Sequence, residues 1–465
     1  MAEDLGMASP HVLIVPFPAQ GHVIPLMELA QRIAKHGIRV TFVNTEITHK
    51  RILSSLADPE DLVALDDRIC LVAIPDGLES DEERKIPGKL SEAIYRVMPG
   101  KLEELIKTMN ASSTEEDRVT CLIADQSLGW AQELASNLGI RRVAFLPAAA
   151  ATLVLGFNIP RLIEDGIIDQ DGTQLKEQVV QLAPGMPLMN STEFVWACLG
   201  NSMMQKVIFQ AMVQNNQVVK LADWLICNST YDLEPGAFSL APEIVPIGPL
   251  LASNRLGNSA GQFCQEVSSC LNWLDKQPRR AVIYVAFGSS SVLSNEQLEE
   301  LALGLELSNR PFLWVVPPGG TNSHSGAIEG ILSRRMASQG EIVRWAPQQK
   351  VLSHPAVACF LSHCGWNSTV ESVGNGVPVL CWPYFADQFT NQSYICDIWK
   401  VGLKFIRDAT GTIRGEEIKE KIDELLENVA YKERALQLQE IMMKNSSEGG
   451  SSHKNFTDFI SWLKA

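Results

Sequence analysis

The feature that most constrains the fold is a strand–turn–helix pattern that occurs twice, once in each half of the chain. In the first copy, the apolar run His11–Val15 is followed by a turn at 19–22 and an amphipathic helical segment. In the second copy, the apolar run 281–287 is followed by a small-residue loop at 288–291 and the helical segment Asn295–Leu307. Strands that alternate with helices in this way predict a parallel sheet with helices on both faces. We therefore expect an α/β fold with two such halves.

Further strands of the same kind are expected in both halves, at 38–43, 69–74, 120–124, 142–146, 224–227, 312–316, 357–361 and 377–381. A chain of 465 residues is too long for one ordinary hydrophobic core, so two domains are expected. Near residue 246 a Pro-Ile-Gly-Pro run leads into a stretch rich in Ser, Asn and Gly, which is typical of a linker. We therefore place one domain at 1–245, a linker at 246–262, a second domain at 263–445 and a terminal segment at 446–465.

The terminal segment is predicted to hold a helix. Phe456, Phe459, Ile460 and Leu463 recur at helical spacing and form an apolar stripe that needs a surface to pack on. Two other stretches, 317–326 and 445–452, are rich in small and polar residues and are predicted to be mobile loops.

Composition and charge exclude several classes of protein. Apolar residues make up 46% of the chain and charged residues 20%, which is typical of a folded globular protein. The net charge of −15 argues against nucleic acid or an anionic membrane surface as a partner, because both require a basic footprint. The cysteines form no CxxC pair or zinc-ligand array, and no apolar run is long enough for a signal core or a membrane span. We therefore expect a cytoplasmic protein that binds no metal.

The densest group of chemically informative residues lies at 345–388. Here a predicted strand ends in the run His363-Cys364-Gly365, and a helix begins near Asn367. A helix N-terminus flanked by Gly, Asn, Ser and His is suited to phosphates. Trp345 offers a flat face on which a base could stack, and the run Asp387-Gln388 can hydrogen-bond to sugar hydroxyls.

Each of these residues also has a purely structural interpretation. Ser368 and Glu371 fit a capping box, in which Glu371 only satisfies a backbone donor. Trp345 could belong to the core, and His363 could be a buried histidine whose hydrogen bonds are satisfied. From the residues alone, phosphate binding is one alternative among these.

The segment 345–388 resembles the signature box of the plant family-1 UDP-glycosyltransferases, the secondary-product glucosyltransferases. It matches in length, in its Trp-Ala-Pro-Gln start, in its HCGWNS centre and in its Asp-Gln end. The likeness extends over the chain through PFPAQGH near the N-terminus and through WLD at 273–275 and FGS at 287–289. It implies a GT-B fold, in which two Rossmann-like, doubly wound domains face each other across a cleft. The N-terminal domain would bind the acceptor, the C-terminal domain would bind the UDP-sugar, and 446–465 would dock back on the N-terminal domain.

The resemblance also implies a role for each matching residue of the donor site. Trp345 would stack on the uracil, and Glu371 would bind the ribose hydroxyls. A final Gln in the box is similar to glucose users, whereas galactose users often carry His there, so UDP-glucose is the expected co-substrate. The diphosphate would be held by Ser289, His363, Asn367 and Ser368, and the sugar by Trp366, Asp387 and Gln388, with Ala346 and Gln348 beside the uracil.

His22 and Asp125 match the general base of the family and the carboxylate that orients it. Each lies near the end of a predicted strand, and strand ends of one sheet converge as such a pair requires. On the residues alone, His22 could be structural and Asp125 could be a helix cap. The resemblance implies an inverting, metal-independent displacement, in which His22 takes the acceptor proton while the acceptor oxygen attacks the anomeric carbon.

One stretch departs from the family pattern. Many relatives have Ser or Thr after the strand at 142–146, where this chain has Pro147 and four alanines, so the contact to the 6-hydroxyl of the sugar is in doubt. The acceptor is expected to bind N-terminal loops that include 80–87 and 157–194, and flavonoids or other phenolics are expected before terpenoids or hormones. An apolar, adaptable wall is expected from Met186, Met189, Phe194 and Trp196.

Two functions of other classes compete with this interpretation. A nucleotide-dependent oxidoreductase would need a GxGxxG motif after an opening strand, and the sequence has none there. A non-catalytic carrier of hydrophobic molecules would need neither the pair His22 and Asp125 nor the donor box. We therefore predict a monomeric UDP-glucosyltransferase, with UDP-glucose and a small aglycone as its partners and no other cofactor.

Overall fold

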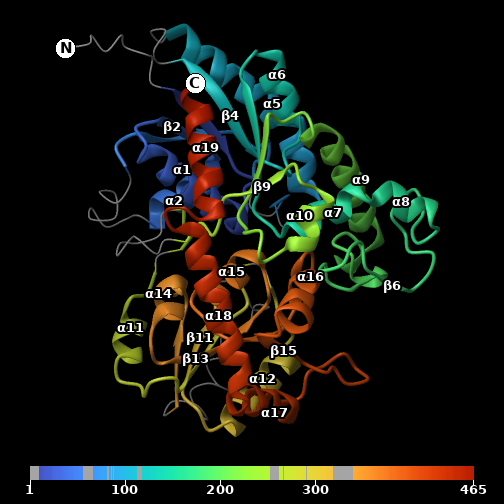
Figure 1. Ribbon diagram of the computed structural model, residues 1–465, viewed down its shortest axis with the longest axis vertical. Coiled ribbons are helices and arrows are strands. Elements are labelled where there is room, and N and C mark those ends of the chain that lie inside the picture. The colour runs from blue at the N-terminus through green and yellow to red at the C-terminus, as the bar shows by residue number, and fades with distance from the viewer. Residues whose placement is uncertain are drawn as a thin grey trace. The chain divides into compact units, whose positions relative to one another are not determined.

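The computed structural model of the protein describes residues 10–55, 66–80, 83–84, 86, 88–112, 118–199, 201–251, 261–264, 266–289, 291–317 and 339–465. The chain forms two compact units, each with its own parallel sheet (Figure 1). Unit 1 contains Met1–Pro184, Asn190–Cys264 and Asn445–Ala465. Unit 2 contains Gly185–Met189 and Gln265–Lys444.

Unit 1 is built on a seven-stranded parallel sheet in the order β3-β2-β1-β4-β5-β8-β9. The central strand β1 is buried along its whole length, which explains why its sequence is a continuous apolar run and not an alternating one. The strands are β1 (His11–Val15), β2 (Arg39–Thr45), β3 (Ile69–Ile74), β4 (Val119–Asp125), β5 (Arg141–Leu146), β8 (Trp224–Cys227) and β9 (Ile244–Pro246).

The other elements of unit 1 are helices and an excursion between β5 and β8. The helices are α1 (Gln20–Ala34), α2 (Glu46–Ser55), α5 (Lys89–Ser112), α6 (Trp130–Asn137), α7 (Ala150–Phe157), α8 (Ile159–Glu164), α9 (Ser202–Val219), α10 (Pro235–Leu240) and α19 (Ser451–Lys464). The excursion also holds the short strands and 3-10 turns β6 (Val179–Val180), β7 (Met189–Asn190), η2 (Ser191–Glu193) and η3 (Ala197–Leu199). Its segment Gly185–Met189 belongs to unit 2.

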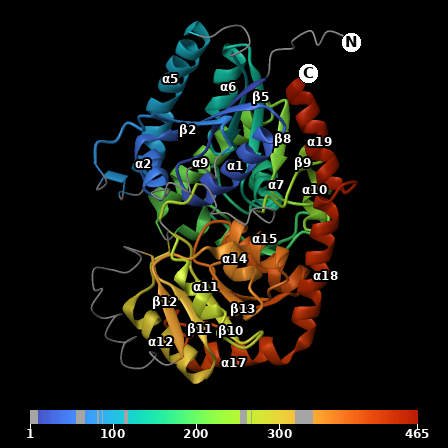
Figure 2. The ribbon, with the colours of Figure 1, turned by 90° about the vertical axis from the view of Figure 1, so that its left-hand side faces the viewer.

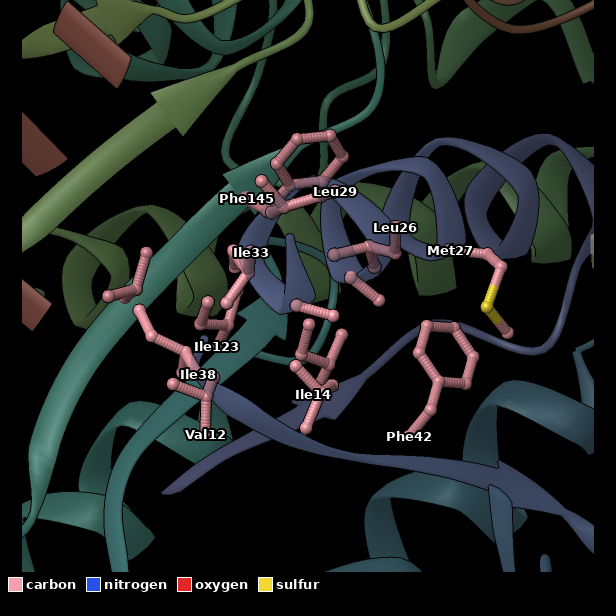
Figure 3. Packing of buried hydrophobic residues seen from close by; sticks show 14 of the residues in the cluster. Val12, Ile14, Leu26, Met27, Leu29, Ile33, Ile38, Phe42, Ile123 and Phe145 are labelled. Carbon is pink, nitrogen blue, oxygen red and sulfur yellow. The ribbon is translucent and has the colours of Figure 1, made fainter. Parts of the chain in front are cut away.

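Helices cover both faces of this sheet. α1, α2 and α19 pack on one face, and α5 and α6 pack on the other. Figure 3 shows the first of these layers, in which Leu26, Leu29 and Ile33 of α1 lie over Val12 and Ile14 of β1. Side chains three and four residues apart share one helix face, so the apolar stripe of α1 meets the sheet as its spacing predicts.

Unit 2 repeats this architecture on a six-stranded parallel sheet in the order β12-β11-β10-β13-β14-β15 (Figure 2). α12 and α17 pack on one face, and α11 and α14 pack on the other. The strands are β10 (Val282–Ala286), β11 (Phe312–Val315), β12 (Gly340–Val343), β13 (Val357–Ser362), β14 (Val379–Cys381) and β15 (Gly402–Lys404). The helices are α11 (Ser269–Leu274), α12 (Asn295–Leu307), α14 (Gln348–Ser353), α15 (Trp366–Gly374), α16 (Gln388–Ser393), the π-helical turn η4 (Tyr394–Ile398), α17 (Gly415–Glu427) and α18 (Val429–Ser446).

The strands predicted from the sequence are all present, with ends that differ by up to two residues. Five strands were missed, β6, β7, β9, β12 and β15. Each has only two to four residues, which is too short for a hydrophobic period to be recognised. Over the ranges described above, no helix is long and apolar enough to cross a membrane.

Two predicted loops differ from the structure. The turn predicted at 19–22 is wrong, because α1 begins at Gln20 and places His22 in its first turn. The loop predicted at 445–452 shrinks to the four residues that separate α18 from α19. The loop predicted at 317–326 lies, apart from Pro317, outside the described residues.

The C-terminal helix α19 packs on unit 1. All four residues of its apolar stripe are buried in the cluster that α1 forms with the sheet. The ring of Phe459 lies 5.5 Å from that of Trp224, and Nδ2 of Asn455 donates a hydrogen bond of 2.8 Å to the carbonyl of Pro246. Removing α19 would therefore expose part of the core of unit 1.

Candidate active site

Both sheets have the strand order of a doubly wound fold, and this order determines where a site can form. In unit 1 the chain leaves the centre of the sheet in opposite directions from β1 and β4, and in unit 2 from β10 and β13. A crevice opens beyond the carboxyl ends of two such strands, and ligands bind there. The predicted site residues follow these same strands: His22 comes after β1, Asp125 ends β4, Ser289 follows β10 and His363 follows β13.

In unit 1 the structure brings His22 and Asp125 into contact. Nδ1 of His22 lies 2.7 Å from Oδ2 of Asp125, whose side chain is fully buried. The His22 side chain is 31% exposed. A carboxylate accepts hydrogen bonds only, so Nδ1 carries the hydrogen, and in the neutral ring the basic lone pair is then on Nε2, which is the tautomer of a general base.

The structural alternative for Asp125, a helix cap, is wrong. The next helix, α6, has Gly129 as its N-cap, with no side-chain capping bond. The second oxygen of Asp125 accepts a 2.8 Å hydrogen bond from the backbone N–H of Ser127. Both carboxylate oxygens are thus engaged, one by the histidine and one by the turn after β4.

In unit 2 the loop after β13 leads into a helix whose first turn is open to an anion. α15 begins at Trp366, its N-cap is Gly365, and no side chain caps it. The first intrahelical bond runs from Thr369 N–H to the Gly365 carbonyl, and helix geometry directs the N–H groups before it out of the helix end. Cys364 holds a positive φ of 63°, which is rare for a residue with a side chain and makes the loop turn sharply.

His363 lies between two glycines that make room for its ring. A Cβ atom at Gly288 would lie 2.7 Å from Nε2 of His363, and one at Gly365 would lie 2.5 Å from it, so any larger residue at either position would displace the ring. Burial lowers the pKa of His363 to about 4, and a hydrogen bond with the Ala286 backbone opposes part of that shift. The imidazole is therefore neutral near pH 7 and can offer a hydrogen bond but no positive charge.

Glu371 is not the end of a capping box, since α15 begins two residues before Ser368 and Glu371 bonds to side chains. Its Oε2 accepts a 2.6 Å bond from Nε2 of Gln348, and its Oε1 accepts a 3.1 Å bond from Nε2 of Gln349. Gln348 Nε2 also lies 2.9 Å from Oγ of Ser368, and its Oε1 accepts a bond from the hydroxyl of Tyr284. A carboxylate held in this network can accept hydrogen bonds from a pair of vicinal hydroxyls.

The aromatic residues of the donor box differ in exposure. Trp345 is partly exposed and its carbonyl accepts a bond from Val267 N–H, so its ring can offer a face to a ligand. Ala346 is buried in the core of unit 2. Trp366 is only 3% exposed and its ring packs 6.3 Å from that of Trp399, so we expect its contribution to come from its backbone.

Asp387 and Gln388 lie at the start of α16. Oε1 of Gln388 accepts hydrogen bonds of 2.7 and 3.1 Å from the backbone N–H groups of Tyr384 and Phe385. These two bonds fix the orientation of the amide, so its Nε2 points away from them and can donate to other partners. Oδ2 of Asp387 accepts a 2.9 Å bond from Nδ2 of Asn391.

Asn391 is a residue that sequence reasoning missed. Its Nδ2 also donates a 2.9 Å bond to the carbonyl of Cys364, so it joins Asp387 to the loop before α15. It is fully buried. In the sequence, only its spacing of four residues from Asp387, which places two side chains side by side on a helix, could have indicated that the two are in contact. That spacing is too common in helices to predict a functional site.

The stretch that departs from the family pattern, 147–151, leads into α7. The N–H groups of Ala150 and Ala151 donate bonds of 2.9 and 3.0 Å to the carboxylate of Glu234, which is fully buried and also accepts a bond from the Ser229 hydroxyl. The start of α7 is thus bound by a carboxylate of its own unit.

The wall predicted for the acceptor is not exposed. Met186, Met189, Phe194 and Trp196 are all buried. The rings of Phe194 and Trp196 pack against each other, and Trp196 also packs against Phe209 of α9. Phe194, Trp196 and Phe209 therefore form an aromatic cluster that stabilises the excursion. Among the residues the structure describes, no three His, Cys, Asp or Glu side chains are grouped so that they could hold a metal ion.

Comparison with known proteins agrees with this geometry. A model of the UDP-glucoronosyl and UDP-glucosyl transferase family matches residues 91–447, and a glycosyltransferase N-terminal domain model matches residues 9–141. UDP-glycosyltransferase 83A1 of Arabidopsis thaliana is 51% identical over 464 residues, covering 99% of this chain and 98% of the relative.

Two solved structures are similar over almost the whole chain. Os79 of O. sativa in complex with UDP has a TM-score of 0.80 at 28% identity, covering 97% of this chain and 100% of that one. A UDP-glucosyltransferase of Polygonum tinctorium capable of glucosylating indoxyl, in complex with 3,4-dichloroaniline, has a TM-score of 0.82 at 30% identity, covering 98% and 99%. The predicted fold and enzyme class are confirmed, and nothing supports a non-catalytic carrier. The chain belongs to the UDP-glucoronosyl and UDP-glucosyl transferase family and is a UDP-glycosyltransferase of GT-B fold.

Proposed function

We propose that the protein transfers glucose from UDP-glucose to a hydroxyl of a small lipophilic acceptor, with inversion at the anomeric carbon. The observation that carries the proposal is the 2.7 Å contact between His22 and the buried Asp125 at the carboxyl edge of the first sheet. A hydroxyl is a poor nucleophile near neutral pH, and a neutral imidazole whose Nε2 carries the lone pair can remove its proton as it attacks.

His22 and Asp125 act as base and orienting group in this proposal. The acceptor hydroxyl donates to Nε2 of His22, and its oxygen attacks the anomeric carbon from the face opposite UDP. The C–O bond to the diphosphate breaks as the new bond forms, and the proton moves to Nε2. Asp125 then stabilises the imidazolium through the bond to Nδ1.

The donor site of unit 2 stabilises the negative charge that develops on the diphosphate as UDP leaves. The N–H groups at the start of α15, the side chains of Asn367 and Ser368 in its first turn, and Ser289 after β10 hold the diphosphate in this proposal. His363 adds a neutral hydrogen-bond donor, since its pKa of about 4 keeps it uncharged. The positive potential at the N-terminus of a helix can stabilise the diphosphate charge in place of a metal ion. We therefore propose that the reaction is metal-independent.

The nucleoside and the sugar are assigned to the two ends of the donor box. Trp345 stacks on the uracil beside Ala346 and Gln348, and Glu371 accepts the ribose hydroxyls. Asp387 accepts sugar hydroxyls, and Gln388 donates to them through its nitrogen, because its oxygen is engaged by the two backbone N–H groups. Trp366 contributes through its backbone. Asp387 as hydrogen-bond acceptor and Gln388 as hydrogen-bond donor favour the hydroxyl pattern of glucose in this proposal. Asn391 holds Asp387 in place through the bond from its Nδ2.

For the acceptor we propose a flavonoid or another phenolic first, and a terpenoid or hormone next. The similar enzyme of Polygonum tinctorium is named for glucosylating indoxyl and was solved with a small aromatic amine, which supports an aromatic acceptor. We also propose that the enzyme is a monomer and works in the cytoplasm.

The test is a panel of aglycones incubated with UDP-glucose and read by mass. We expect a gain of one hexose on at least one phenolic, with release of UDP, and no product from the His22→Ala variant on aliphatic alcohols. No product from any aglycone, or equal rates with UDP-galactose and UDP-glucose, would refute the proposed donor and acceptor.

A further inference from the structure

The turn that carries Asp125, at residues 125–129, is held by two side chains from distant parts of unit 1. Oδ1 of Asn215, on α9, accepts a 3.0 Å bond from the N–H of Gly129, and its Nδ2 donates a 3.1 Å bond to the carbonyl of Ser127. The hydroxyl of Tyr95, on α5, lies 2.7 Å from the same carbonyl and 2.9 Å from Oδ1 of Asn215. Asn215 is only 7% exposed. Both hydrogen-bonding ends of its amide are therefore used on this turn.

Gly129 shows how closely α9 approaches the turn. A Cβ atom at this position would lie 2.5 Å from Oδ1 of Asn215 and 3.1 Å from its Cα atom. Real Cβ atoms essentially never lie as close as 2.5 Å to another heavy atom, so a larger residue at this position would force the Asn215 amide away from its two partners. The close contact between α9 and the turn is thus built into both segments.

These bonds lead to the base through one residue, Ser127. The Ser127 carbonyl is held by Asn215 and Tyr95, and the Ser127 N–H donates 2.8 Å to Oδ1 of Asp125, whose other oxygen holds His22. Burial, opposed by the hydrogen bond to Asn215 and aided by the nearby charge of Asp125, raises the pKa of Tyr95 to about 12. Tyr95 therefore stays a hydrogen donor throughout the neutral pH range.

We propose that Asn215 is a positioning residue for the transfer reaction: it holds the 125–129 turn so that Asp125 orients His22 toward the acceptor hydroxyl. The inference rests on the proposed roles of His22 and Asp125. It assigns a part in catalysis to a residue of α9 that lies outside every motif in the sequence, 90 positions after Asp125 in the chain.

The test compares the Asn215→Ala variant with the native enzyme on a weakly acidic alcohol. An error of about 1 Å in the position of a catalytic group can cost about 100-fold in rate, so we expect kcat to fall about 10- to 100-fold. The KM for UDP-glucose should stay unchanged, because Asn215 and the turn that it holds belong to unit 1, whereas the proposed donor box belongs to unit 2. On a strongly acidic phenol, which ionises without a base, kcat should fall far less.

A double-mutant cycle separates positioning from loss of stability. If Asn215 acts through Asp125, adding Asn215→Ala to Asp125→Ala should lower kcat little further. Tyr95→Phe removes one hydroxyl and keeps the ring, so it should lower kcat in the same direction by a smaller factor while the protein stays folded. Gln214→Ala removes an amide from the exposed side of the same helix and should leave kcat unchanged.

The outcomes distinguish this inference from the proposed function. If His22→Ala and Asp125→Ala leave kcat unchanged, the proposed catalytic pair itself is wrong. If these variants lose activity but Asn215→Ala and Tyr95→Phe do not, or if the losses from Asn215→Ala and Asp125→Ala multiply, Asn215 does not position the base. A rise in the KM for UDP-glucose with kcat unchanged would also overturn the inference.

Discussion

Replacing Asp125 by Asn tests the catalytic pair most directly, because the structure uses both carboxylate oxygens as acceptors. One oxygen accepts from Nδ1 of His22 at 2.7 Å and the other from Ser127 N–H at 2.8 Å. Asparagine keeps the volume but has a single acceptor oxygen. If that oxygen stays with Ser127, the amide NH₂ faces Nδ1 of His22, and Nδ1 must then accept a hydrogen bond. The hydrogen of the imidazole moves to Nε2, so Nε2 can no longer take the proton of the sugar-accepting hydroxyl.

The size of the effect follows from the role of the base. A positioned base contributes roughly 10²–10⁴ in rate, so His22→Ala should lower kcat by about that factor on a weakly acidic alcohol. Asp125→Asn should lose nearly as much, because it leaves His22 in the wrong tautomer. The double variant should be little worse than His22→Ala alone, since partners that act as one unit are not additive.

The assay is steady-state release of UDP, normalised to folded enzyme. In the His22→Ala variant the buried Asp125 loses the hydrogen bond from Nδ1 and keeps the one from Ser127. Because a hydrogen bond to a charged group contributes about 1.5–3 kcal/mol to the free energy of unfolding, the melting temperature of each variant must be measured too. UDP binding should persist in all three variants. Losses that multiply in the double variant, or more than about a tenth of the native rate in His22→Ala, would refute the reasoning.

Four further outcomes are expected. Gln388→His should lose glucose transfer more than UDP affinity, measured by turnover and titration, because histidine cannot accept the N–H groups of Tyr384 and Phe385 as the amide does. Turnover should persist in EDTA. Complete loss of turnover that Mg²⁺ or Mn²⁺ restores would contradict the proposal that the N-terminus of α15 stabilises the diphosphate without a metal ion. Deleting residues 454–465 should lower the melting temperature, since it removes four buried apolar side chains. Because the pKa of His363 falls from 6.5 to about 4, the folded state binds fewer protons than the unfolded state in that range. Unfolding free energy should therefore drop by up to about 1.4 kcal/mol per pH unit from about pH 6.5 toward 4, and His363→Gln should lack that part of the slope in denaturant titrations.

The long buried strands and the two catalytic candidates could be predicted from the sequence. β1 and β10 are continuous apolar runs, and each is followed by strand-breaking residues, Pro16 and Pro18 after β1 and Gly288 after β10. The five short strands that were missed could not be predicted, because pairing with a neighbouring strand is what makes a few residues, such as those of β15, extended. The apolar residues near Trp196 were misassigned for a related reason, since composition does not distinguish a buried packing cluster from an exposed wall.

The sequence by itself determined the α/β class, the family and the residue types at the site, because these depend on local periodicity and on contiguous motifs. Only the tertiary structure decided which atoms meet. His22 and Asp125 are 103 residues apart, and they touch because β1 and β4 are neighbours in the sheet. Asn215 reaches the same turn from α9 through contacts that no local pattern records. Side-chain hydrogen bonds form over about 3 Å and depend on how distant segments pack, so they are properties of the fold as a whole.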